Sequence, residues 1–169
     1  MDAVFLRSQL AHQADAIRGL TAGVSPEMAR RRPAQEQWSM LEVVNHLGDE
    51  EVEDFRAHLG QALAADGQTW RPIDPQGWAA ARQYNRRDWA TSLEQFLAER
   101  RRSLHWLEGL GEADWQQSIQ APWGAVRAGD LLAAWAMHDC LHIRQLVELR
   151  RELLLAECAP YRVEYAGDW

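Results

Sequence analysis

Residues 135–146, Trp-Ala-Met-His-Asp-Cys-Leu-His-Ile-Arg-Gln-Leu, contain the pattern that decides the fold. Apolar residues recur here at three- and four-residue spacing, which predicts an amphipathic helix. His138 and His142 are four residues apart, so their side chains lie one above the other on one face of this helix. The same face carries an apolar stripe formed by Leu131, Trp135, Leu146, Leu149 and Leu153. Both imidazoles are therefore expected to point into the protein.

Helical periodicity extends through most of the 169-residue chain. Four long helices are predicted over about residues 2–21, 39–64, 86–110 and 129–157, with a short extra helix near Pro26. Residues 66–78 and 111–127 are predicted as irregular connections, the second with a turn at Pro122-Trp-Gly124. No run alternates convincingly with the period of two that a strand shows. The prediction is therefore an all-α four-helix bundle that forms a single domain over residues 1–169.

The second long helix has the clearest start signal in the chain. Ser39 and Glu42 have the spacing of a capping box. Trp38 precedes the cap and can pack on Val43 as a hydrophobic staple. This helix is therefore expected to begin immediately after Ser39.

Composition and charge exclude several classes of function. The chain is 47% hydrophobic and 25% charged, as in ordinary globular proteins. Its formal net charge of −7 argues against nucleic acid or an anionic membrane as a partner. Every basic residue is an arginine, which excludes lysine chemistry such as Schiff bases. There is no CxxC motif, no signal-peptide pattern and no apolar run of about 20 residues that could span a membrane. We therefore expect a cytoplasmic protein.

A shared metal ion is the favoured interpretation of His138 and His142. Two buried imidazoles would otherwise each need a hydrogen-bond partner, and two adjacent imidazolium charges would be costly. The alternative is a pair of core histidines with separate partners. A metal needs a third ligand from a facing helix, and His46 is the best candidate. The stripe that it shares with Glu50 and Asp54 only borders the apolar face, so spacing alone leaves its role open.

Other polar residues receive weaker assignments. Arg100 shares a stripe with apolar residues of the third long helix. It could point inward and bind a substrate or cofactor carboxylate. We prefer the alternative that it lies at the bundle end, where it forms an ion pair or extends to solvent. Asp139 lies about 100° round the helix from the ligands, so it is expected to support a ligand rather than bind the metal. Cys140 faces away. Surface positions are expected for His12, His58 and His105.

Two segments of the chain resemble the DinB/YfiT-like family of candidate metal-dependent enzymes. They are Trp38-Ser-Met-Leu-Glu42-Val-Val-Asn-His46-Leu-Gly-Asp-Glu50 and His138-Asp-Cys-Leu-His142-Ile-Arg-Gln145-Leu146. With the four helices, the resemblance covers nearly the whole chain. It implies a four-helix bundle with up-down-down-up topology, in which the connection at 66–78 is the crossover. It also implies a divalent metal, zinc or nickel, held by His46, His138 and His142.

Three neutral imidazoles leave at least one metal position open, as in catalytic zinc sites. Such an ion can lower the pKa of bound water to about 7 or bind a thiolate. Glu50, one turn after His46, could then be a fourth ligand, an acceptor for an imidazole N–H, a general base or a solvated carboxylate.

The resemblance implies a thiol-dependent S-transferase that uses a low-molecular-weight thiol, and a hydrolase that uses metal-bound water fits the same ligands. Either enzyme would act on a small-molecule substrate. The alternative from another class is a non-catalytic metal-binding bundle with a structural or stress-related role. The resemblance also implies a homodimer, because members of the family often dimerise through helix faces, whereas the residues themselves carry no signal of oligomeric state.

Overall fold

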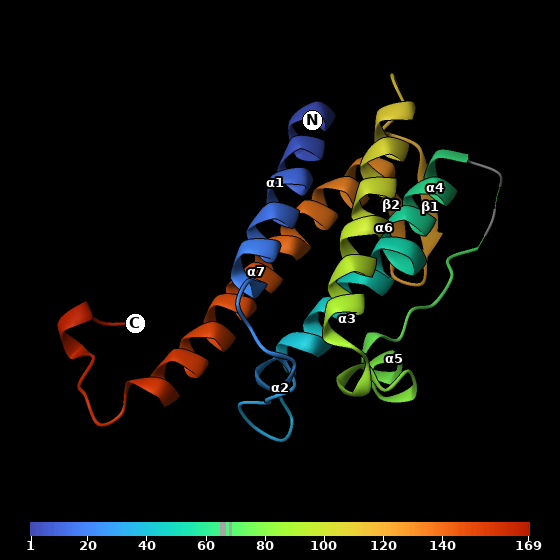
Figure 1. Ribbon diagram of the computed structural model, residues 1–169. Coiled ribbons are helices and arrows are strands. Elements are labelled where there is room, and N and C mark those ends of the chain that lie inside the picture. The colour runs from blue at the N-terminus through green and yellow to red at the C-terminus, as the bar shows by residue number, and fades with distance from the viewer. Residues whose placement is uncertain (65–66, 68) are drawn as a thin grey trace.

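The computed structural model describes residues 1–64, 67 and 69–169, and its long helices form a bundle (Figure 1). The bundle consists of α1 (Ala3–Thr21), a second unit made of α3 (Met40–Glu50), η1 (Glu51–Phe55) and α4 (Arg56–Ala64), then α6 (Trp89–Gly109) and α7 (Ala128–Cys158). Shorter helices are α2 (Pro26–Ala29), α5 (Pro75–Ala81), η2 (Tyr84–Arg86) and η3 (Glu164–Ala166). The predicted all-α four-helix bundle is confirmed.

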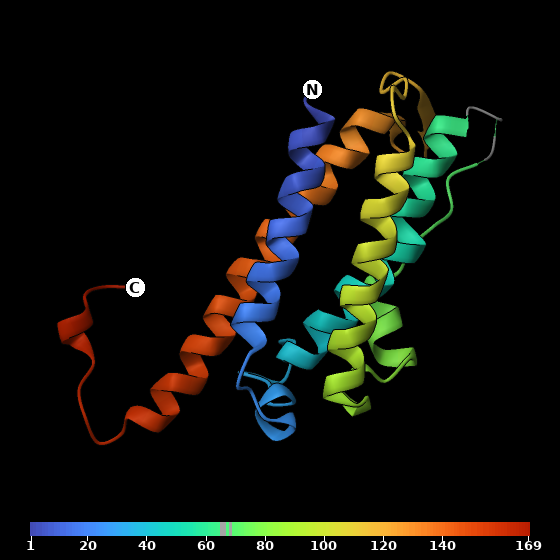
Figure 2. The same cartoon turned by 45° about the horizontal axis from the view of Figure 1, so that its top comes forward.

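The order of helix directions is up-down-down-up. In Figures 1 and 2, α1 and α7 run in one direction, whereas the α3–α4 unit and α6 run in the other. Two consecutive long units are therefore parallel, so the chain must return along the bundle between them. The predicted connection 66–78 occupies this crossover; Asp66 and Gln68 lie outside the described residues, and the segment becomes helical at Pro75.

The start of α3 has the predicted capping box. The backbone N–H of Glu42 donates to Ser39 Oγ at 3.2 Å, and the backbone N–H of Ser39 donates to Glu42 Oε2 at 2.9 Å. The helix that follows contains the turn η1, which is a π-helix. A π-helical turn inserts one extra residue into an α-helix, and the apolar periodicity gave no indication of it.

The connection between α6 and α7 contains a small hairpin that was not predicted. Strands β1 (Ser118–Ala121) and β2 (Gly124–Arg127) pair antiparallel, with Ile119 opposite Val126 and Ala121 opposite Gly124. The predicted turn at Pro122 and Trp123 is the two-residue loop between them. Each strand has four residues, which is too short for an alternating pattern to be recognised.

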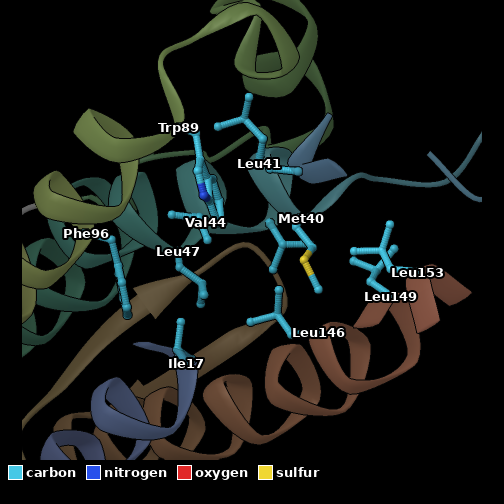
Figure 3. Close-up of a cluster of buried hydrophobic side chains, with 12 residues drawn as sticks. Ile17, Met40, Leu41, Val44, Leu47, Trp89, Phe96, Leu146, Leu149 and Leu153 are labelled. Atoms are coloured by element: carbon cyan, nitrogen blue, oxygen red, sulfur yellow. The ribbon is translucent and has the colours of Figure 1, made fainter. Parts of the chain in front are cut away.

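The apolar core is divided into two clusters. Figure 3 shows the first, in which Ile17 of α1, Leu47 of α3, Phe96 of α6 and Leu146 of α7 meet. The second includes Leu10, Phe55, Leu59, Ile119, Leu132 and Trp135. Along both α3–α4 and α7, buried polar side chains lie between the residues of the two clusters. No helix in the described part of the chain is both long and apolar enough to cross a membrane.

Candidate metal centre

Three histidines from two helices converge between the apolar clusters. His46 comes from α3, and His138 and His142 come from consecutive turns of α7. The Nε2 atom of His46 lies 3.2 Å from that of His138 and 3.0 Å from that of His142. The Nε2 atoms of His138 and His142 are 3.2 Å apart. The structure thus brings together the three residues predicted as metal ligands.

The arrangement of these nitrogens fits one divalent metal ion. Three nitrogens bound at about 2.0–2.1 Å with tetrahedral angles are about 3.3 Å apart, close to the separations here. Each neutral imidazole has one N–H and one lone pair. If the three N–H groups point outward, three lone pairs face one another with no proton between them. A metal ion would accept all three lone pairs.

Hydrogen-bond acceptors outside the cluster favour this orientation. The Nδ1 atom of His142 lies 2.9 Å from the amide oxygen of Gln145, which can only accept, so the ring proton is on Nδ1. His46 Nδ1 faces Glu50 Oε1 at 3.6 Å. Both of these atoms are buried and have no closer partner among the described residues. Acceptors on the outward nitrogen fix the tautomer and ring orientation of metal-binding histidines.

The three rings resist protonation. Burial, followed by the charges of His142 and His138, lowers the pKa of His46 to about 2. Burial and the charge of His142 likewise lower the pKa of His138 to about 3, although Asp54 opposes this shift. Burial also lowers the pKa of His142. The rings are therefore neutral near pH 7, which is the form that binds metals.

Glu50 lies behind His46, on the side of the ring away from the three converging nitrogens. It is 3% exposed, so it is not a solvated surface carboxylate. Burial, a hydrogen bond with Asp54 and the charge of Asp54 raise the pKa of Glu50 to about 9. A protonated carboxyl in this position is poorly suited to act as a fourth ligand or a general base. The geometry fits an acceptor for the His46 N–H.

Arg100 is inside the bundle and paired with carboxylates of the chain itself. Its Nη1 and Nη2 atoms lie 2.5 and 2.9 Å from the two oxygens of Asp139, and its Nε donates to Glu51 Oε1 at 2.8 Å. Burial opposes the Arg100 cation, but these carboxylates outweigh burial and raise its pKa. The placement favours the ion-pair interpretation over substrate or cofactor binding, with the pair deep in the core rather than at the bundle end. Both carboxylate oxygens of Asp139 accept hydrogen bonds from Arg100. The expectation that Asp139 supports a metal ligand was therefore wrong.

His58 is fully buried, so its predicted surface position was wrong. Its Nδ1 lies 2.6 Å from Asp54 Oδ1, and its Nε2 lies 2.8 Å from the carbonyl oxygen of Arg71. On a regular α-helix, His58 would be turned about 120° from His46, whereas the extra residue of the π-helical turn reduces this angle to about 20°. The recurrence of His46, Glu50, Asp54 and His58 every four residues is the signal that could have found it. His12, His105 and Cys140 are exposed, as predicted.

A cavity of about 740 Å³ borders the three-histidine cluster. His46 and His142 line it together with Trp38, whose ring centroid is 4.9 Å from that of His46. Much of the remaining lining is polar: Glu36, Gln37, Gln76, Gln145, Glu148 and Arg151. The cavity gives a small molecule a route to the converging nitrogens.

The chain is similar to known proteins of one family. The model of the DinB superfamily matches residues 9–146. A relative from Geobacillus thermodenitrificans, named as a candidate metal-dependent hydrolase, is 29% identical over 141 residues, covering 81% of this chain and 78% of the relative.

YfiT from Bacillus subtilis, described as a candidate metal-dependent hydrolase with an unusual four-helix-bundle topology, superposes with a TM-score of 0.78. The match covers 89% of this chain and 87% of YfiT at 17% identity, so it shows a shared fold. Because the family model covers most of the sequence, this chain belongs to the DinB superfamily, the family that the two histidine-containing segments predicted.

Proposed function

We propose that this chain is a metal-dependent hydrolase of small molecules, in which His46, His138 and His142 hold one divalent transition metal, zinc or nickel. The observation that supports this most strongly is the convergence of three neutral Nε2 atoms at the edge of a cavity. When bound, such an ion supplies a Lewis acid that activates water or holds a thiolate. Three protein ligands leave a position for a substrate or water.

The chain's own residues prepare this position. Gln145 accepts from the outward nitrogen of His142, and Glu50 faces the outward nitrogen of His46 at 3.6 Å, an arrangement that favours deprotonated inward nitrogens. The cavity volume is within the range of sites for small molecules, and Trp38 provides an apolar wall beside His46. Glu50 is proposed to orient His46 rather than to act as the general base, because the Glu50 carboxyl holds its own proton near pH 7.

A thiol-dependent S-transferase is the second candidate. The size and polar lining of the cavity favour it, since about 740 Å³ can accommodate a low-molecular-weight thiol together with an electrophilic substrate. In this reaction the metal would hold the thiol as a thiolate. Gln37, Gln76 and Gln145 offer amide groups for the polar parts of such a thiol.

Metal analysis of the full chain, purified without a metal-affinity tag, tests the centre. About one equivalent of zinc or nickel is expected. His142→Ala should abolish binding, whereas His105→Ala, which changes an exposed histidine, should retain it. Less than about half an equivalent of any transition metal in the unmodified protein, with His142→Ala unchanged, would contradict the proposal.

A cobalt-substituted protein separates the candidate functions. Turnover of esters, amides or phosphoesters without a thiol supports the hydrolase. Perturbation of the cobalt absorption by a thiol, together with conjugation of that thiol to generic electrophiles, supports the transferase. If metal removal collapses the helical fold and neither thiols nor inhibitors change the cobalt spectrum, the metal has the structural role of the non-catalytic alternative.

A further inference from the structure

We propose that His58 is a positioning residue for the metal centre. It acts on the ligand His46 through the buried carboxyls of Asp54 and Glu50, and it connects the crossover segment at Trp70 to the ligand. The proposal rests on the three-histidine centre but not on the reaction that takes place there.

The four side chains form a continuous series of contacts along one side of α3–α4. His58 Nδ1 lies 2.6 Å from Asp54 Oδ1. Asp54 and Glu50 are joined by a side-chain hydrogen bond. Glu50 Oε1 then faces His46 Nδ1 at 3.6 Å. All four residues are buried, with exposures of 8% or less.

The donor and acceptor properties of these groups determine the direction of each contact. The carbonyl oxygen of Arg71 can only accept, so His58 Nε2 carries a hydrogen. A hydrogen bond between Asp54 and Glu50 requires one proton, which Glu50 holds when His58 donates to Asp54 Oδ1 from Nδ1 as well as to Arg71 from Nε2. The rotamer of Asp54 thus depends on His58, and the rotamer of Glu50 depends on Asp54. Without the bond from His58, Asp54 could turn and release Glu50 from its place behind His46.

The π-helical turn makes this alignment possible. A regular helix would rotate His58 about 120° away from His46, which would break the series of contacts. The extra residue in η1 (Glu51–Phe55) returns His58 to the side occupied by Glu50 and His46. Such turns are rare and occur frequently at functional sites. The turn therefore has a specific structural consequence, which is to place His58 in line with the ligand.

The outer end of the series is held by the crossover. The rings of His58 and Trp70 stack with centroids 3.8 Å apart and an interplanar angle of 4°. Trp70 in turn meets Trp123 of the hairpin edge-on at 5.1 Å. The Arg71 guanidinium forms a separate ion pair with Glu53 at 3.1 Å. A displacement of the crossover would therefore be transmitted to the ring of His58.

Two isosteric variants separate the two contacts of His58. In His58→Asn the amide nitrogen takes the place of Nδ1, so the bond to Asp54 is kept and the bond to Arg71 is lost. In His58→Gln the amide nitrogen takes the place of Nε2, with the opposite result. Arg71→Ala is the matched control, because it removes the ion pair with Glu53 and leaves the backbone carbonyl in place.

The measurements are zinc affinity by chelator competition and the visible spectrum of the cobalt-loaded full chain. His58→Gln should weaken zinc binding about three- to tenfold and change the cobalt spectrum, by the effect known for outer-sphere partners of ligands. His58→Asn and Arg71→Ala should stay within about twofold of the unmodified protein. Equal zinc affinities for the two His58 variants, whether both weakened or both unchanged, would overturn the proposal.

Nuclear magnetic resonance of the unmodified protein tests the positioning role of His58 if a variant does not fold. In spectra of ¹⁵N-histidine-labelled protein, zinc should shift the Nδ1 resonance of His58, although two side chains separate His58 from His46. An unchanged His58 resonance alongside shifted ligand resonances overturns the positioning role only. Failure of the unmodified protein to bind zinc or nickel overturns the proposed function as well.

Discussion

Asp139, the residue that follows the proposed ligand His138, forms a bidentate ion pair with Arg100 in the interior of the bundle. The two contacts measure 2.5 and 2.9 Å, and both side chains are 1% exposed. Arg100 also donates to Glu51 in the π-helical turn and to the carbonyl oxygen of Leu10 in α1. One guanidinium thus joins α1, the π-helical turn, α6 and α7, the helix that carries His138 and His142. Removing the charge of Asp139 breaks this bidentate contact and leaves Glu51 to balance the buried Arg100 cation.

Asp139→Asn should therefore lower the free energy of unfolding by about 2 to 3 kcal/mol, measured by urea denaturation at pH 7, because it weakens buried hydrogen bonds to a charged group. The control is Asp15→Asn, which breaks the exposed 2.8 Å pair between Asp15 and Arg18 on α1. That substitution should cost less than about 1 kcal/mol, because solvent screens exposed pairs. Equal losses in the two variants would show that Arg100 does not depend on Asp139.

Gln145 should affect metal affinity without being a ligand. Its amide oxygen accepts from His142 Nδ1 at 2.9 Å, so Gln145→Ala is expected to weaken zinc binding about tenfold. Gln145→Glu supplies a stronger acceptor at the same position and should retain or increase the affinity. Arg144→Ala changes the exposed neighbouring residue and is the control. Unchanged affinity in Gln145→Ala, measured by chelator competition, would show that the tautomer of His142 is fixed in another way.

Local signals in the sequence predicted most of the fold. The capping box at Ser39 and Glu42, and the periodicity of the long helices, depend on residues within one or two turns of each other. The spacing of His138 and His142 likewise places both side chains on one helix face before any tertiary structure is known. His46 is 92 residues away from His138, and its assignment as a ligand depended on the family resemblance.

The remaining features depend on contacts or irregularities that spacing does not reveal. A helical wheel assumes a constant number of residues per turn, so the π-helical turn placed His58 at the wrong angle. The partner of Arg100 is 39 residues further along the chain, and nothing near either residue identifies the pair. The strands beside Pro122 are too short to show a period of their own.

Replacement of Glu50 distinguishes an orienting carboxyl from a catalytic or metal-binding carboxylate. In Glu50→Gln the amide can donate to Asp54 and accept from His46, as the protonated glutamic acid does. Zinc affinity should then stay within about threefold, whereas Glu50→Ala should weaken it about 10- to 100-fold. If the glutamine and alanine variants lose equal affinity, the negative charge of Glu50 is required, which would favour a direct role at the metal.

The pKa shifts predict opposite effects of pH on the metal-free protein. The histidine pKa values are lowered from 6.5 on folding, to about 2 for His46 and about 3 for His138. Below pH 6.5 the unfolded chain binds more protons at these sites, so their contribution to stability is lost as the pH falls. The pKa of Glu50 is raised from 4.5 to about 9, so its contribution is lost as the pH rises between these values.

The metal-free protein should therefore be most stable near pH 6.5. Between pH 4.5 and 6.5 the three histidines outweigh the single Glu50, so the free energy of unfolding rises with pH. Above this range the histidine effect ends and the Glu50 effect continues, so stability declines towards pH 9. Urea denaturation from pH 4.5 to 9 measures this profile. Glu50→Gln should flatten the alkaline decline and steepen the rise between pH 4.5 and 6.5, because it removes a titrating group that opposes the three rings there. A wild-type protein whose stability still rises between pH 7 and 9 would show that Glu50 is ionised in the folded protein and cannot hold the proton that its hydrogen bond with Asp54 requires.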